Sequence, residues 1–266
     1  MGGGFTSSGY PLDDFPDAEA AYSFRRLRSD FTGSVVKLKR TFDSTSQEFT
    51  FASGSDYLDT GSADSFCSAG GGLCTIEYWY DQSGNTRHIG GGAFAPEYAD
   101  APDLTPTKKS IYFDGVNDGL ERDAGAGTLV FFSTASTEIL VVNDAAYSFI
   151  DINDDPRGLK WTTTNIEVEP SASAVVPFSA SITSSIIGGI LDSTIFYGWG
   201  DGVFKGQDII ASGVTGSMAA YGGAPGAYLE GYHFEYIRWN KTIENKNLKI
   251  LMDSTNDFYD TPNYTY

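Results

Sequence analysis

Short stretches in which hydrophobic and polar residues alternate are the dominant pattern of this chain. In residues 34–42, Val36 and Leu38 share one face, and Lys37 and Lys39 share the other. A period of two residues predicts a β-strand with one buried face. The same reasoning predicts further strands or strand pairs at residues 48–52, 75–80, 128–132, 137–143, 147–153, 158–162, 182–191, 193–202 and 229–241.

Two segments follow helical rules instead. Asp17 is a suitable N-cap for a helix over residues 18–29, whose late arginines complement the helix dipole. Apolar residues at helical spacing predict a second helix over residues 244–258. Residues 1–16 contain several glycines and prolines and predict a flexible arm, which leaves residues 17–266 as a single domain.

Composition agrees with a β-rich fold and limits the partners. The 266 residues include 31 Gly, 16 Tyr and 18 Phe, which favour short strands and tight turns. The formal net charge is −18, so nucleic acid and anionic membrane surfaces would repel the protein. No apolar run approaches the ~20 residues that cross a bilayer, so membrane insertion is not expected. The first residues lack the basic start and apolar core of a secretory signal.

Several motifs resemble known families. Residues 20–33 read AAYSFRRLRSDFTG and residues 79–89 read WYDQSGNTRHI, with the basic run VVKLKR and a cysteine pair between them. Together they resemble the start of the catalytic domain of family 54 α-L-arabinofuranosidases, and the same module is similar to one in tailed-phage virion proteins. Residues 110–121, SIYFDGVNDGLE, resemble a strand-turn-strand of laminin-G-like domains. The resemblance implies an all-β jelly-roll sandwich of the concanavalin A/laminin-G type, with a short N-terminal helix and a C-terminal helix.

In the arabinofuranosidase pattern, a cysteine pair just before the Tyr-Asp-Gln-Ser-Gly element forms a disulfide. The resemblance therefore implies a bridge between Cys67 and Cys74, worth about 2 to 3 kcal/mol by loop entropy. The alternative is two reduced thiols in a protein assembled in a reducing cytoplasm.

Two kinds of ligand site are considered. Aromatic and polar residues near turns could contact a carbohydrate, and the residues selected on this ground are Trp79, Asp81, Asn85, Trp199 and Tyr221. The alternative for the 81–85 turn is that its side chains cap backbone amides and lock a corner of the sandwich. Oxygen ligands at alternate positions could bind calcium at Asp151, Asn153 and Asp155, the alternative being an ordinary acidic turn. No cofactor is expected, with calcium at these three residues as the alternative.

Catalysis by a retaining glycosidase needs two carboxylates about 5 Å apart. The family 54 enzymes use a glutamate and an aspartate late in the domain, and the segments around them match no stretch of this chain. Acidic residues are nevertheless available there: Asp151, Asp154, Asp155, Glu167, Glu169, Asp192, Asp201 and Glu235. Without an identifiable pair, the sequence predicts a protein that is not an enzyme.

The predicted function is therefore a structural protein of a tailed-bacteriophage virion. It would lie on the particle exterior as a capsid decoration, a head or tail fibre, or a receptor-contact module. The N-terminal arm would dock on other virion proteins, the sandwich could bind a host-surface glycan, and homo-oligomers are expected. The alternative is a carbohydrate-active enzyme of the α-L-arabinofuranosidase type, or a carbohydrate-binding module.

Overall fold

A computed structural model describes the backbone of most of the chain. The described residues are 9–101, 108–122, 129–130, 135–148, 150–151, 158–162, 165–169, 175–177, 185–192, 195–209, 217–218, 220–221, 223–224, 227–228 and 230–261. The side chains of residues 122–135, 143–185 and 210–229 are not part of the description.

Three helices and 22 strands make up the described chain. The helices are α1 (Pro11–Asp14), α2 (Thr60–Ser68) and α3 (Asn245–Tyr259). The strands are β1 (Ala20–Ser23), β2 (Val36–Arg40), β3 (Ser46–Phe49), β4 (Cys74–Trp79), β5 (Ile89–Gly91), β6 (Glu97–Asp100), β7 (Lys109–Asp114), β8 (Leu120–Arg122), β9 (Leu129–Val130), β10 (Ala135–Ser148), β11 (Ile150–Asp151), β12 (Gly158–Thr162), β13 (Asn165–Glu169), β14 (Val175–Pro177), β15 (Ser185–Asp192), β16 (Ile195–Gly200), β17 (Val203–Ile209), β18 (Ser217–Met218), β19 (Ala220–Tyr221), β20 (Gly223–Ala224), β21 (Ala227–Tyr228) and β22 (Glu230–Trp239).

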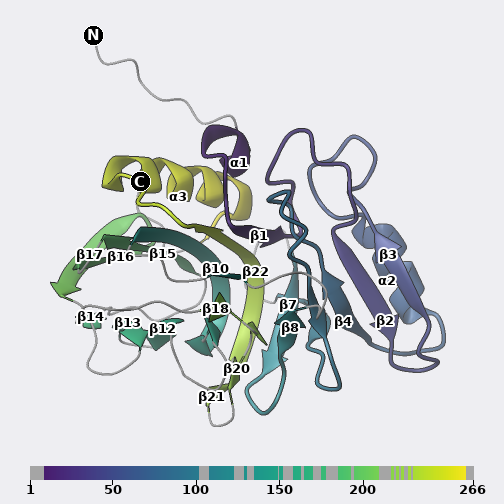
Figure 1. Cartoon of the computed structure of the whole chain (residues 1–266). Coiled ribbons are helices and arrows are strands. Elements are labelled where there is room, and N and C mark those ends of the chain that lie inside the picture. Colours follow the sequence, from purple (N-terminus) through teal and green to yellow (C-terminus); the bar gives the residue numbers. More distant parts are fainter. Residues whose placement is uncertain are drawn as a thin grey trace.

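Antiparallel pairing arranges these strands as a jelly-roll-like sandwich, which confirms the predicted fold class. One sheet runs β17–β16–β15–β10–β22, and the other edge of β22 pairs with β1 and with β7 at different positions. A second group runs β3–β2–β4–β5–β8. Figure 1 shows β2, β3 and α2 on the right of the molecule, with α3 at the upper left above β15–β17.

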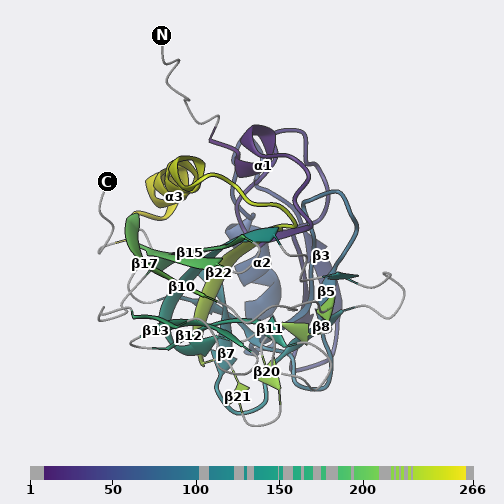
Figure 2. The ribbon, with the colours of Figure 1, turned by 60° about the vertical axis from the view of Figure 1, so that its left-hand side comes forward.

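The sheet around β10 and β22 is buried on both faces. On β10, Leu140 and Val142 contribute to a core that also contains Ile76 and Trp79 of β4. The intervening Ile139 and Val141 contribute to a second core under α3. A strand covered on both sides reads as a continuous apolar run, as residues 139–142 do. Figure 2 shows α3 above β15 and β17 of the same sheet.

The predicted helix over residues 18–29 is wrong. Residues Ala20–Ser23 form β1 and pair with Arg238 through Glu235 of β22. All four residues of β1 are buried, so tertiary pairing overrides the local helix signals. The short N-terminal helix is α1, within the segment predicted as an arm, where Leu12 is buried and its amide donates to Leu27 O at 2.9 Å.

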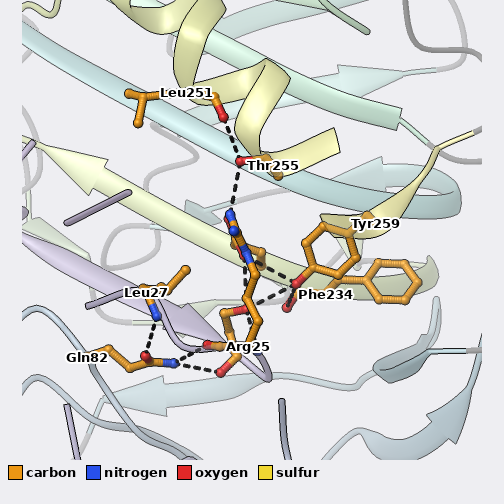
Figure 3. A network of polar contacts seen from close by, with 9 residues as sticks. Arg25, Leu27, Gln82, Phe234, Leu251, Thr255 and Tyr259 are labelled. Atoms are coloured by element: carbon orange, nitrogen blue, oxygen red, sulfur yellow. Dashed lines mark hydrogen bonds and ion pairs between the residues drawn. The ribbon is translucent and has the colours of Figure 1, made fainter. Parts of the chain in front are cut away.

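Gln82, in the Asp-Gln-Ser-Gly turn after β4, holds the backbone that follows β1 in place. The Gln82 side-chain amide donates to Ser23 O and Arg25 O, each at 2.9 Å, and its oxygen accepts from the Leu27 amide at 2.9 Å. Gln82 is fully buried. Because buried backbone groups need partners, this side chain does for residues 23–27 what a neighbouring strand would otherwise do (Figure 3).

Alternation along β4 is broken by a bulge. Lys37 pairs with Tyr78, whereas the next residue of β2, Leu38, pairs with Ile76, so Glu77 is an extra residue. The bulge rotates the end of β4, and Ile76 and Trp79 both become fully buried. Strict alternation over the predicted strand at residues 75–80 would place Trp79 on the face opposite Ile76, and the bulge is the reason that both lie in the core.

Candidate functional site

The turn after β4 is a structural corner. Asp81 Oδ1 accepts from the amides of Ala21 and Ser83 at 2.9 Å each, and Asp81 Oδ2 accepts from the Arg87 amide at 3.1 Å. The Asn85 side chain donates to Ala18 O at 2.8 Å and to Glu19 O at 3.1 Å. Both side chains are thus engaged with the protein's own backbone, as in the alternative that locks a corner of the sandwich.

The other residues selected for carbohydrate contact do not gather with these two. Trp79 has no exposed surface. Trp199 is half-buried on β16, with its ring centroid 5.4 Å from that of Phe204 on β17. Tyr221 belongs to β19, and its side chain lies outside the described residues. The described structure therefore forms no shared sugar platform from this set.

The residues selected for calcium fall largely outside the description. Asp151 is described only as backbone of β11, and Asn153 and Asp155 lie among the residues that the structure leaves out. In the described part of the chain, no three His, Cys, Asp or Glu side chains gather as a metal site.

Contacts remove two of the eight acidic residues from the catalytic candidates. Glu235 is fully buried and accepts two hydrogen bonds from Arg25, at 2.7 and 2.8 Å. Asp201 is buried in the turn between β16 and β17, where its Oδ1 accepts from the Ile186 amide at 2.9 Å. Both carboxylates hold elements together, whereas Asp192 is exposed at the end of β15.

A surface pocket of about 610 Å³ lies on β2, β4, β5 and β8. This volume is within the range of small-molecule sites. The charged and aromatic residues that line it are Lys39, Arg40, Glu77, Tyr78 and Glu121. Gly90, Gly91 and Gly92 line another part of the pocket. These residues come from four strands and the loops that follow them, so no single stretch of sequence indicates the pocket. The glycine run after Ile89 is the one local signal.

Glu77 in this pocket is held in its ionised form. Burial alone would raise the pKa of Glu77, but hydrogen bonds from Ser46 and Lys37 lower it below its usual value. The Lys37 ammonium lies 2.9 Å from Glu77 Oε1. A general acid needs a raised pKa, so Glu77 is suited to accepting hydrogen bonds from a ligand and unsuited to donating a proton.

Asp118 differs from Glu77 in its protonation. It is buried in the turn between β7 and β8, where its Oδ2 accepts from the Asp114 amide at 2.9 Å. Burial and the nearby carboxylates of Asp114 and Glu97 raise the pKa of Asp118 to about 6, against a smaller lowering by the Asp114 amide. A carboxyl with this pKa is half-protonated in mildly acidic solution.

The raised pKa of Asp118 predicts a pH-dependent stability. A carboxyl whose pKa is higher in the folded chain stabilises it below the unfolded pKa, near 3.8, and this stabilisation is lost as the pH rises through about 6. We expect the Asp118→Asn variant to gain about 2 kcal/mol relative to wild type between pH 4 and pH 7. Urea unfolding of both proteins at the two pH values measures the change. Parallel pH profiles would contradict the prediction.

The N-terminal part of the chain is similar to a known family of catalytic domains. The family model described as "Alpha-L-arabinofuranosidase B, catalytic" matches residues 10–109. This part of the chain is arabinofuranosidase-like. Alpha-L-arabinofuranosidase B of Aspergillus niger and that of Aspergillus kawachii are each 32% identical to it over 80 residues. The match covers 30% of this chain and only 16% of each relative's length.

Solved structures extend the likeness in fold to most of the chain. A GH54 a-l-arabinofuranosidase soaked with a cyclic sulfate inhibitor superposes with a TM-score of 0.68 at 16% identity, covering 89% of this chain and 62% of that one. An arabinofuranosidase complexed with arabinofuranosyl-alpha-1,2-xylobiose gives a TM-score of 0.63 over the same shares, also at 16% identity. The described sandwich therefore has the fold of these proteins.

These matches correct the predicted function. The prediction of a structural virion protein, with its capsid, tail-fibre and bacteriophage associations, is wrong, because the similar proteins are arabinofuranosidases and the matching family is a catalytic domain. The prediction that the chain is not an enzyme is overturned by the same matches. That prediction rested on the absence of a recognisable carboxylate motif. At 16% identity the fold is kept although the sequence around such a motif is no longer recognisable.

A disulfide joins Cys67 at the end of α2 to Cys74 at the start of β4. Disulfides persist in oxidising compartments, so the bridge agrees with the coarser part of the predicted location, which is an exterior one. The finer placement on a virus particle has no support. Among the described residues, none of the helices has the length and apolar character that crossing a bilayer requires.

Proposed function

We propose that this chain is a glycoside hydrolase that acts on α-L-arabinofuranosides. The match of residues 10–109 to the arabinofuranosidase catalytic family carries the proposal. The fold supports it, because 89% of the chain superposes on a GH54 arabinofuranosidase. In the reaction, water is consumed, the glycosidic C–O bond breaks, and arabinose and the free alcohol are released.

The substrate of the first test is 4-nitrophenyl a-l-arabinofuranoside, with which a glutamate-to-glutamine mutant of a GH54 enzyme was soaked. We expect the full chain to release 4-nitrophenol from it, and to release much less from the matching β-D-xylopyranoside. Absence of release from the arabinofuranoside at any pH between 3 and 8, by a chain shown to be folded, would refute the proposal.

Six carboxylates then remain for mutagenesis, because Glu235 and Asp201 have structural contacts. They are Asp151, Asp154, Asp155, Glu167, Glu169 and Asp192. Each is changed to its amide, with Glu244→Gln as a control, because Glu244 is an exposed carboxylate at the start of α3. Loss of a nucleophile is expected to lower kcat by at least about 1,000-fold on every substrate, since no intermediate then forms. Loss of the general acid is expected to leave kcat on the nitrophenyl substrate nearly unchanged, because the nitrophenolate leaving group needs little protonation.

A further inference from the structure

We infer that the pocket on β2, β4, β5 and β8 is a binding site for a neutral, hydroxyl-rich polysaccharide. The choice of an arabinose-bearing polysaccharide as its ligand rests on the proposed function. The pocket itself is argued from its charges, its apolar rim and its glycine floor.

The charges in the pocket balance. Lys39 and Arg40 provide two cations, and Glu77 and Glu121 provide two carboxylates. Arg40 is already engaged by Asp43 through two hydrogen bonds, of 3.1 and 2.6 Å. A polyanionic ligand would also be repelled by the net charge of −18 on the protein. Hydroxyl groups can donate to the carboxylates and accept from the lysine, so a neutral sugar satisfies this lining.

Three large apolar residues are mostly exposed and adjoin lining residues, in sequence or through a backbone hydrogen bond. Phe42, 69% exposed, follows the lining residue Thr41. Leu73 is 59% exposed, and its carbonyl accepts from the Thr41 amide at 3.0 Å. Phe94, 57% exposed, lies between the lining residues Ala93 and Ala95. Exposed aromatic rings of this kind stack on the C–H faces of sugar rings.

The glycines make the pocket floor tight and unable to carry side chains. A Cβ on Gly91 would lie 2.3 Å from Ile76 O and 2.3 Å from Ala95 Cβ. A Cβ on Gly90 would lie 2.9 Å from Glu77 O. Because the backbone of β4 lies where a side chain at either position would begin, β5 needs glycine at both positions to pair with β4.

Gly92 provides the test, because a Cβ there would meet nothing within 4 Å. The Gly92→Phe variant therefore adds a ring to the pocket without a clash at its base. We expect it to raise the Kd for soluble arabinoxylan at least tenfold in affinity electrophoresis and titration calorimetry. The matched control is Gly61→Phe on α2, where the nearest atom to a Cβ is at 3.6 Å, and we expect its Kd to equal that of wild type.

Glu121→Ala is the second variant, because Glu121 lines the pocket and is exposed. We expect it to weaken binding at least threefold, and thermal melting verifies that each variant is folded. Equal Kd values for wild type, Gly92→Phe and Glu121→Ala would overturn the inference. So would the absence of arabinoxylan binding by wild type, or a preference for polygalacturonate over arabinoxylan.

The outcome is independent of the hydrolysis assay. Binding that depends on Gly92, in a chain that releases no nitrophenol, refutes the proposed hydrolase and leaves the pocket inference standing. Nitrophenol release without arabinoxylan binding refutes the pocket inference and leaves the hydrolase standing.

Discussion

The Arg25→Ala variant is expected to lose about 3–5 kcal/mol of its free energy of unfolding. Arg25 and Glu235 form a buried ion pair, with 2% and 0% of their side chains exposed. Removing the guanidinium would leave an unpaired carboxylate inside the protein, which is the costly half of breaking such a pair. Urea unfolding at pH 7 measures the loss, which corresponds to a fall in Tm on the order of 10 °C.

The size of this effect comes from what the pair connects. Arg25 follows β1, Glu235 belongs to β22, and the Arg25 Nη2 also donates to Thr255 Oγ1 of α3 at 3.1 Å. Ser23 Oγ and Tyr259 OH donate to the same Glu235 oxygen, at 3.0 and 3.2 Å. Figure 3 shows Arg25 reaching between the strands toward Thr255 and Tyr259. Glu235 also raises the pKa of Arg25 above its usual value, although burial alone would lower it.

Two variants separate a charge effect from a loss of packing. Arg25→Met combined with Glu235→Leu removes both charges and is expected to recover part of the stability lost by Arg25→Ala. Lys246→Ala breaks an exposed ion pair with Glu244 and is expected to change the stability by less than about 1 kcal/mol. If Arg25→Ala were as stable as Lys246→Ala, the buried network would not have the role assigned to it.

The Trp79→Ala variant is expected to lose about 3–5 kcal/mol as well, because it leaves a large cavity in the core between the sheets. Trp79 is fully buried, and its ring centroid lies 5.5 Å from that of Tyr22 and 6.0 Å from that of Phe24. Truncation removes contacts to β1 and to the segment after it. Guanidinium unfolding followed by tyrosine fluorescence measures the loss.

This variant also distinguishes the two interpretations of Trp79. A sugar platform on the surface would lose ligand affinity on truncation and keep its stability, whereas a core residue loses stability. Ile209→Ala is the control, because Ile209 is 72% exposed at the end of β17 and its truncation leaves no cavity. A Trp79→Ala protein as stable as Ile209→Ala would contradict the buried position.

The local patterns of the sequence were sufficient for many elements. Alternation predicted β2, β12 and β22 to within a few residues, and helical spacing predicted α3 to within one residue at each end. In each of these elements the apolar residues repeat with one spacing from end to end, and this spacing can be read from the segment alone, without knowledge of the strands beside it. Helix α2 was missed, because its sequence TGSADSFCS has no clear apolar stripe.

The candidate sites were less predictable than the strands. The Asp81 side chain accepts from backbone amides, and the Asn85 side chain donates to backbone carbonyls. A polar turn residue looks the same in the sequence whether it binds backbone or a ligand. The pocket lining comes from residues as far apart as Lys39 and Glu121. Only the pairing of β2, β4, β5 and β8 places them together, and no local signal specifies that order.

By itself the sequence determined the β-rich class, the terminal strand and helix, and an N-terminal part similar to arabinofuranosidases. Tertiary structure alone decided that residues 20–23 form a strand, that a bulge at Glu77 buries Trp79, and that Ser23 lies within 3.0 Å of Glu235, 212 residues away. The physical reason is that periodicity is a property of one segment. Pairing partners, bulges and buried charges depend on the free energy of contacts between segments, which the order of residues in either segment does not display.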